Sequence, residues 1–99
     1  MNLHGTSLIA GALGATGGAT YRAANPALGT TLEPEFHEAS AADVARAMNA
    51  AAAAFGAFRE SSAQERAAFL ERIAGQIEEL GDALIERASA ETALPVARL

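Results

Sequence analysis

The helical part of this chain is set by residues 40–80, which read SAADVARAMNAAAAAFGAFRESSAQERAAFLERIAGQIEEL. This stretch contains two patterns that indicate the start of a helix. Ser40 is followed three residues later by Asp43, and Ser62 is followed three residues later by Glu65. Each serine can accept a hydrogen bond from the backbone N–H three residues later. Glu65 can also accept from the Ser62 N–H, which makes a full capping box, whereas Asp43 makes a near capping box and sits in the first turn, where the helix dipole favours an anion. We therefore predict helices that begin after Ser40 and after Ser62.

Hydrophobic residues follow each start at helical spacing. The first set is Val44, Met48, Ala51, Phe55 and Phe58. The second set is Leu70, Ile73, Ala74, Ile77 and Leu80, continued on nearly the same face by Leu84, Ile85 and Ala88. Spacings of three and four residues place each set on one face of a helix. We expect Gly56 and the Ser61-Ser62 pair to weaken or stop the first helix.

The second hydrophobic stripe crosses Gly81, so it is compatible with one kinked helix or with two. Glycine inside a helix costs about 1 kcal/mol relative to alanine. Asp82 also lies four residues from both Glu78 and Glu86, and like charges at this spacing disfavour one straight helix. We favour two helices with a break at Leu80 or Gly81. Pro95 should end the last one, because the residue before proline avoids the helical region.

Residues 1–39 predict short strands and turns, because most of the chain's glycines and all prolines but one lie there. The expected strands are Ser7–Ala10, Thr20–Ala23, Thr30–Leu32 and Glu35–Glu38. A loose turn is expected over Gly14–Gly18. A tighter turn is expected over Asn25–Gly29, since asparagine, proline and glycine each favour turn conformations. Pro34 confines its stretch to a sheet edge or a bulge.

The composition excludes several classes of protein. The 99 residues contain no cysteine, so they hold no disulfide, thiolate metal site or cysteine nucleophile. Alanine accounts for 27 residues, which makes the hydrophobic core lean. A net charge of −5 argues against nucleic-acid or membrane partners. No basic leader with a long apolar region and no run of about 18 apolar residues is present, so we expect a cytoplasmic protein.

The glycines at positions 11, 14, 17 and 18 raise the possibility of a nucleotide-binding loop. Their spacing is Gly-x-x-Gly-x-x-Gly-Gly, which differs from the dinucleotide fingerprint Gly-x-Gly-x-x-Gly. No apolar helix follows them. We favour a hairpin turn.

Two further groups of polar residues invite a functional interpretation. His37 and Glu35 fall on one face of a strand, but His4 is the only other imidazole, so an exposed strand is favoured over a metal site. The second group is acidic and comprises Glu78, Glu79, Asp82 and Glu86. It flanks the hydrophobic stripe, so a solvated helix face is favoured over acid–base chemistry or contact with another domain.

Four segments together resemble the aldehyde dehydrogenase family over nearly the whole chain. Tyr21–Gly29, YRAANPALG, is similar to the family's NPATG turn near the start of its members. Residues 39–55 and residues 65–78 are similar to the family's first two helices. Ala90–Pro95, AETALP, is similar to its ETGKP segment, with Ala93 for glycine and Leu94 for lysine. Leu94 and the stretch Leu32–Ala39 look most like the branch that oxidises 2-oxoglutarate semialdehyde (2,5-dioxopentanoate).

The resemblance implies an α/β parent protein in which residues 1–99 form an N-terminal β-hairpin region followed by about three α-helices. Members are much longer than this chain, so we expect a fragment or a truncated product. The cofactor and catalytic domains would lie outside it. The implied chemistry is thiolate attack on an aldehyde, hydride transfer to NAD or NADP, and thioester hydrolysis.

The resemblance carries no catalytic, cofactor-binding or metal-binding side chain onto these residues. In some members a backbone carbonyl before the turn helps to bind a monovalent cation, and Ala24 holds that position here. The implied partners are the rest of the chain, a small aldehyde and further copies in a homo-oligomer. An independent helical interaction module without catalytic activity is the alternative.

Overall fold

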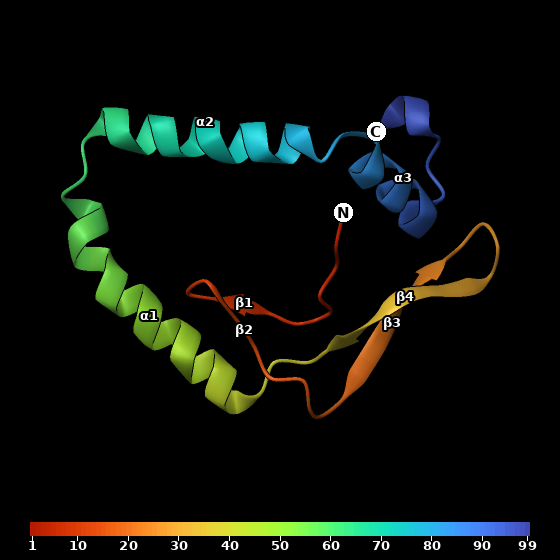
Figure 1. Cartoon of the computed structure of the whole chain (residues 1–99), viewed down its shortest axis with the longest axis horizontal. Coiled ribbons are helices and arrows are strands. Elements are labelled where there is room, and N and C mark those ends of the chain that lie inside the picture. The colour runs from red at the N-terminus through yellow and green to blue at the C-terminus, as the bar shows by residue number, and fades with distance from the viewer. The chain divides into compact units, whose positions relative to one another are not determined.

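The computed structural model describes residues 1–99. Short strands come first and helices follow (Figure 1). The elements are β1 (Leu8–Ile9), β2 (Ala12–Leu13), β3 (Thr20–Asn25), β4 (Thr30–His37), α1 (Ala41–Arg59), α2 (Ala63–Glu79), α3 (Gly81–Thr92) and the 3-10 turn η1 (Val96–Arg98). The predicted order of a hairpin region and three helices is confirmed. The chain divides into two compact units, one of residues 3–22 and 34–61, the other of residues 1–2, 23–33 and 62–99.

The first hairpin corrects the sequence prediction. β1 and β2 are antiparallel, with Ile9 opposite Ala12. The turn between them uses Ala10 at φ 49° and Gly11 at φ 78°. Two consecutive positive φ values match the twist of a tight two-residue hairpin. The expected turn at Gly14–Gly18 is therefore wrong as the hairpin turn, because the chain reverses earlier and forms β2, a strand that the sequence analysis missed.

The second hairpin joins β3 to β4. Its turn forms as predicted: the Asn25 side-chain oxygen accepts from the N–H groups of Ala27 and Leu28 at 3.0 and 3.1 Å. Gly29 donates to the Asn25 carbonyl at 2.8 Å and has φ 66°. β4 is one continuous strand through Pro34 rather than the two predicted pieces. A two-stranded sheet has only edges, which is why proline is tolerated there.

Both predicted helix starts form, and the one at Ser40 is a full capping box like the one at Ser62. The Ser40 and Ser62 side chains accept from the backbone N–H groups of Asp43 and Glu65, and both acidic side chains accept from the serine N–H. α1 runs through Gly56 without interruption and ends at Arg59, so the expected weakening at this glycine does not end the helix.

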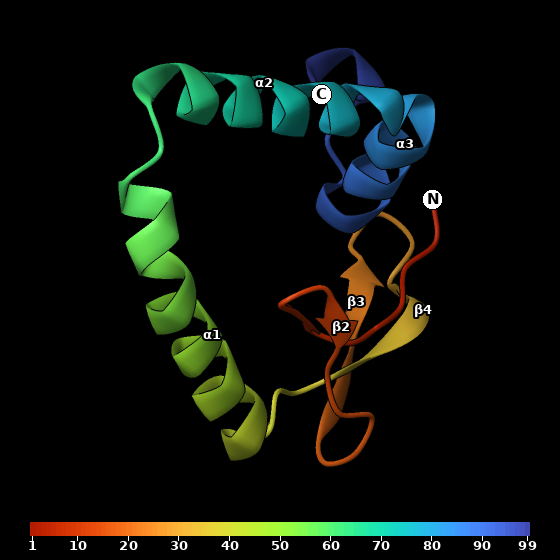
Figure 2. The same ribbon diagram turned by 60° about the vertical axis from the view of Figure 1, so that its left-hand side comes forward.

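The break between α2 and α3 lies at Leu80 and Gly81, as predicted, and Gly81 has φ 52°. α3 ends at Thr92, and the residue that caps it, Ala93, has the left-handed conformation two residues before Pro95. η1 follows and packs against α3, which Figure 2 shows beside it. Arg87 of α3 donates to the Glu33 carbonyl of β4 and to the Glu91 carboxylate.

Buried side chains are few. Ile9 and Asp43 are the buried side chains, with exposed fractions of 8% and 6%. Both belong to the unit in which α1 packs against β1. No helix of the chain combines the length and the apolar character needed to cross a membrane.

Candidate functional site

The most densely bonded polar group of the chain is the Asp43 carboxylate, in the first turn of α1. One of its oxygens accepts from the Ser40 N–H at 3.2 Å and the Ser40 hydroxyl at 2.9 Å. The same oxygen accepts from the Ala15 N–H at 3.2 Å. Arg46 donates to the second oxygen at 3.3 Å. The carboxylate therefore caps its own helix and also holds a loop that lies 28 residues earlier in the sequence.

Arg46 strengthens the same link. Its guanidinium also donates to the Leu13 carbonyl at 3.3 Å, so one side chain contacts both the acid and the end of β2. Gly14 lies between the two attachment points and donates to the Ser7 carbonyl at 2.8 Å. Together these bonds fix the loop after β2 to the start of α1. We call Leu13, Gly14, Ala15, Asp43 and Arg46 the loop clamp.

The surroundings of Asp43 lower the pKa of its carboxyl. The hydrogen bond from the Ser40 hydroxyl is the main cause, followed by the N–H groups of Ser40 and Ala15, while desolvation works in the opposite direction. The group is therefore ionised at neutral pH and has no proton to donate. Because its oxygens already accept four hydrogen bonds, the arrangement is suited to holding structure rather than to general acid catalysis.

A small cavity of about 220 Å³ adjoins the loop clamp. Its walls come from β1 and the residue before it, from the first half of α1 and from Ala39, and they are mostly apolar. The lining residues are Ser7, Ile9, Ala39, Asp43, Val44, Ala47 and Met48. The only charged lining group is the Asp43 carboxylate, which already accepts four hydrogen bonds, and the Ser7 hydroxyl is the other polar side chain of the lining.

The four glycines do not form a phosphate-binding loop. Gly11 occupies the tight turn between β1 and β2, and Gly14 belongs to the loop clamp. Gly17 and Gly18 lie in the segment before β3, where a Cβ would meet nothing within 4 Å. None of them opens a helix, so the N–H groups of a helix N-terminus are not brought to this loop. The prediction of a hairpin role holds for Gly11 alone.

His37 is less exposed than predicted. It lies at the end of β4 and is half-buried, and its Nδ1 is buried without a hydrogen-bond partner. The cause is the amino-terminal segment, which packs against this end of the strand: the His37 N–H donates to the Gly5 carbonyl at 2.7 Å. Glu35 instead accepts from the Thr20 hydroxyl at 2.9 Å, and His4 is exposed. No three acidic or imidazole side chains gather as metal ligands.

The acidic side chains of α2 and α3 are exposed, as predicted for a solvated helix face. Glu79 accepts from Gln76 at 2.8 Å, one turn earlier. The full group is Glu78, Glu79, Asp82 and Glu86. Ala24, whose position the family resemblance links to a cation, lies on exposed β3 next to the Asn25 turn.

Sequence reasoning identified Asp43 only as a helix cap and missed its bond to Ala15. It also missed Arg87, whose Nε lies 2.5 Å from the Glu91 carboxylate and whose guanidinium reaches the Glu33 carbonyl. The only local signal was the three-residue spacing of Asp43 and Arg46 and the four-residue spacing of Arg87 and Glu91. The backbone groups that these side chains also bind, in Ala15 and Glu33, are distant in the sequence and leave no spacing pattern.

Comparisons with known proteins define the class. Residues 14–99 match the model of the aldehyde dehydrogenase family, and the chain belongs to this family. The NPATG-like turn, the two capped helices and the ETGKP-like segment all lie within the matched residues. No solved structure matches the chain.

Three individual relatives that the chain resembles are semialdehyde dehydrogenases. The chain is 51% identical over 100 residues to alpha-ketoglutaric semialdehyde dehydrogenase 2 of Azospirillum brasilense, a match that covers all of this chain and 19% of that protein. It is 45% identical over 64 residues to alpha-ketoglutaric semialdehyde dehydrogenase of Acinetobacter baylyi, covering 65% of this chain and 12% of that protein. N-succinylglutamate 5-semialdehyde dehydrogenase of Paraburkholderia xenovorans is 38% identical over 88 residues, which are 89% of this chain and 18% of that protein. The chain thus spans a fifth or less of the length of these relatives.

Proposed function

We propose that this chain is the amino-terminal segment of an NAD(P)-dependent aldehyde dehydrogenase that oxidises 2-oxoglutarate semialdehyde to the acid. The observation that carries the proposal is the 51% identity, over the whole chain, to alpha-ketoglutaric semialdehyde dehydrogenase 2. The Acinetobacter baylyi relative bears the same substrate in its name. The parent enzyme is expected to be a cytoplasmic homo-oligomer.

Within that enzyme, the segment acts as a scaffold. It has no cysteine to attack an aldehyde, and its one buried carboxylate is committed to four hydrogen bonds. Its glycines are not arranged to hold a pyrophosphate. NAD or NADP, held by the rest of the polypeptide, supplies the hydride acceptor. Residues 1–39 contribute hairpins and residues 40–99 contribute helices to the surface on which the rest of the enzyme is built.

The proposal is tested on the native polypeptide. Antibodies raised against this chain are used to purify the protein from its source, and its mass and aldehyde-dependent reduction of NAD⁺ and NADP⁺ are measured. We expect a polypeptide of dehydrogenase size that prefers 2-oxoglutarate semialdehyde to succinylglutamate semialdehyde. A polypeptide without aldehyde oxidation would contradict the proposal.

The purified 99-residue chain serves as a second assay. We expect it to reduce neither NAD⁺ nor NADP⁺ in the presence of the semialdehyde, because it lacks a thiol nucleophile. Aldehyde-dependent reduction by this chain alone would show that the scaffold role is wrong.

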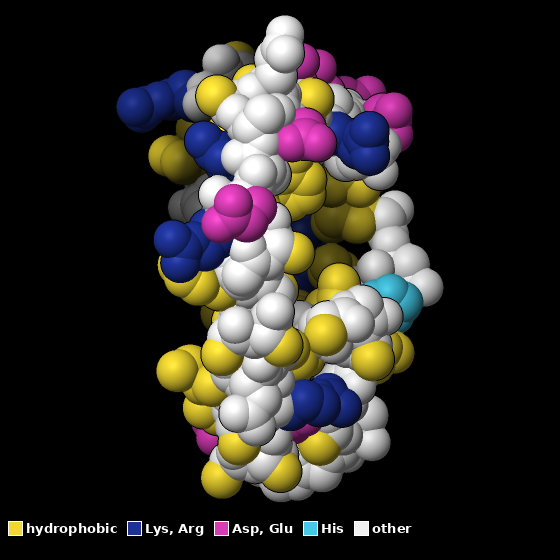
Figure 3. All heavy atoms as spheres, turned by 90° about the vertical axis from the view of Figure 1, so that its left-hand side faces the viewer, with side chains coloured by type: hydrophobic (Ala, Val, Ile, Leu, Met, Phe, Trp, Pro, Cys, Tyr) yellow, Lys and Arg dark blue, Asp and Glu magenta, His cyan; other side chains and the backbone are white.

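An independent interaction module is the second candidate, and the exposed hydrophobic side chains of the helices favour it. Four of them on α1 are Val44, Met48, Phe55 and Phe58, each at least 53% exposed. Figure 3 shows hydrophobic side chains at the surface on this side of the molecule. A monomeric chain that melts cooperatively would favour this candidate over the scaffold, because it would show that the chain folds by itself.

A further inference from the structure

Both ends of α3 have a residue in the left-handed backbone conformation. Gly81 begins the helix with φ 52°, and Ala93 caps its end with φ 58°. Glycine adopts this conformation freely, whereas a residue with a Cβ is disfavoured in it by roughly tenfold. The two junctions therefore need different amounts of support to keep the same backbone conformation.

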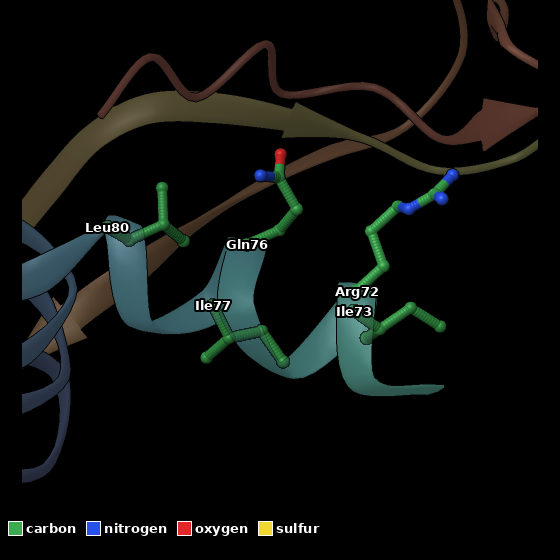
Figure 4. Close-up of a pocket in the computed structure, with 5 residues that line it drawn as sticks. All are labelled: Arg72, Ile73, Gln76, Ile77 and Leu80. Atoms are coloured by element: carbon green, nitrogen blue, oxygen red, sulfur yellow. The ribbon is translucent and has the colours of Figure 1, made fainter. Parts of the chain in front are cut away.

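The junction before α3 is capped without side chains. The Leu80 N–H donates to the Ile77 carbonyl at 3.2 Å, and no side chain bonds to the start of α3 as a cap. Figure 4 shows Leu80 at the end of α2, where it lines a shallow cavity of about 460 Å³ together with Ile77. A Cβ at Gly81 would meet nothing within 4 Å, so the junction uses the glycine for its conformation and not for space.

The junction after α3 is held by two side-chain hydroxyls. The Ser89 hydroxyl donates to the Leu94 carbonyl at 2.7 Å, and the Leu94 N–H donates to the Thr92 hydroxyl oxygen at 3.2 Å. The Thr92 hydroxyl itself donates to the Ala88 carbonyl at 2.7 Å. Both backbone polar groups of Leu94 are thus bonded to side chains of the last turn of α3. The alanine junction has the hydroxyl bonds that the glycine junction lacks.

The strain at Ala93 and the bonds that oppose it are of similar size. The bonds of Ser89 and Thr92 to Leu94 are exposed, and one hydrogen bond favours the bonded form by about fivefold. Two such bonds outweigh a roughly tenfold strain by only a small factor. Every group involved lies within residues 88–94 of one compact unit, so the balance is local.

We infer that the junction between α3 and η1 is a conformational latch. The structure shows its closed form, in which Ala93 is left-handed and η1 packs against α3. In the open form, Ala93 relaxes to one of the backbone conformations that alanine favours, and η1 leaves α3. Ser89 is the positioning residue that keeps the latch closed, and Ala93 supplies the strain that opens it. The latch goes beyond the proposed function and does not depend on the activity of the parent enzyme.

Hydrogen exchange in the 99-residue chain tests the latch. The Leu94 amide reports the closed form because it bonds to Thr92, and the Arg87 amide in the middle of α3 serves as the reference. Ser89→Ala should lower the ratio of closed to open latch by about fivefold, since one bond is lost. Ala93→Gly should raise this ratio by about threefold, because the strain is removed and the freedom of glycine in the open form offsets part of the gain.

The combination of the two substitutions separates a latch from an ordinary helix cap. Ala93→Gly added to Ser89→Ala should bring the Leu94 protection back close to that of the parent chain. An NMR cross-peak between the N–H and Hα of Ala93 gives a second readout, because a positive φ brings these two atoms close together. This cross-peak should be strong in the parent chain and weaken in Ser89→Ala.

Ser61→Ala is the matched control. The Ser61 hydroxyl also bonds to a backbone carbonyl at a helix end, that of Phe58 at 2.6 Å, but the cap residue Glu60 is right-handed. This variant should leave the Leu94 protection and the Ala93 cross-peak unchanged.

Three results would each overturn the inference. In the first, Ser89→Ala changes neither the Ala93 cross-peak nor the Leu94 protection, so the hydroxyl does not hold the latch. In the second, Ala93→Gly fails to restore protection in the Ser89→Ala chain, so strain at Ala93 is not what opens it. In the third, the Leu94 and Arg87 amides exchange with equal protection in the parent and in all variants, so the junction does not open separately from α3.

Discussion

The starts of α1 and α2 use the same local chemistry but differ in their tertiary surroundings. Each has a serine cap and an acidic residue that accepts from the serine N–H. Asp43 of α1 also holds the Ala15 N–H and is 6% exposed. Glu65 of α2 bonds only to Ser62 and is exposed. A capping box therefore fixes where a helix begins, but a third, distant partner decides whether that helix end belongs to a packed structure.

Beyond their starts the two helices differ less. α1 packs against β1 near Ile9, the buried hydrophobic residue of the chain. The apolar side chains of both helices are nevertheless largely exposed. On α1 the exposed fractions of Val44, Met48, Phe55 and Phe58 are 53–68%, and on α2 those of Leu70, Ile73 and Ile77 are 40–63%. Amphipathic helices gain most of their stability from packing the apolar face. Both helices therefore leave apolar surface open to a partner.

The largest expected effect on stability comes from adding a side chain at Gly5, in the compact unit that contains α1. Gly5 has φ 68°, and a Cβ there would lie 2.1 Å from the Glu35 carbonyl oxygen. Gly5→Ala should cost more than about 3 kcal/mol, because a left-handed conformation and a backbone clash act together. Hydrogen exchange of the His37 amide should show it, since that N–H donates to Gly5.

Gly11→Ala is the matched control for this prediction. Gly11 has φ 78°, but a Cβ there meets nothing within 4 Å. Its cost should be limited to the conformational strain, about 1–2 kcal/mol. Equal losses of His37 protection in the two variants would show that the clash with β4 is not the cause.

The next largest effect should follow from Asp43→Ala, compared with Glu65→Ala. Both variants remove the acidic half of a capping box. Asp43→Ala also removes the acceptor of the Ala15 N–H and of one Arg46 hydrogen bond, so hydrogen exchange should accelerate at the Ala15 amide as well as in the first turn of α1. Glu65→Ala should affect only the first turn of α2. Unchanged exchange at Ala15 in the Asp43 variant would contradict the role of the loop clamp.

The boundaries of the helices were predictable because their signals are local. Ser40, Ser62 and Gly81 each act on residues within one turn, and the structure confirms all three boundaries. The Asn25 turn was predictable for the same reason. β2 was missed because its turn places Ala10 at φ 49°, a conformation that alanine rarely adopts.

The candidate site was less predictable because its bonds join distant residues. The Asp43–Ala15 bond spans 28 residues, and the contact from Arg87 to Glu33 spans 54. The exposure of His37 depends on the segment around Gly5, far away in the sequence. Spacing rules describe neighbours on one element, so they do not reveal which loop reaches a helix end.

A smaller effect is expected from Ser62→Ala. The Ser62 hydroxyl caps α2 by accepting one hydrogen bond of 3.2 Å from the Glu65 N–H. The hydrogen bonds of this cap join Ser62 and Glu65 and reach no distant residue. The substitution should cost about 1 kcal/mol of helix stability. Circular dichroism should show reduced helix content, and exchange should accelerate in the first turn of α2 while the Ala15 amide remains protected. A loss of protection at Ala15 would mean that the two helix starts are not independent.

The smallest effect should come from acid, because protonation of Asp43 leaves its side chain in place. Hydrogen bonds from Ser40 and Ala15 hold the pKa of Asp43 below its ordinary value of about 4. The ionised form therefore stabilises the folded state above that ordinary value, and this contribution is lost as the pH falls through the lowered pKa. An NMR titration from neutral pH downward should show the Ala15 amide signal moving with a midpoint below about pH 4. In Asp43→Asn the same signal should stay flat over this range, and a midpoint above the ordinary value in the parent chain would mean that the loop clamp does not favour the carboxylate.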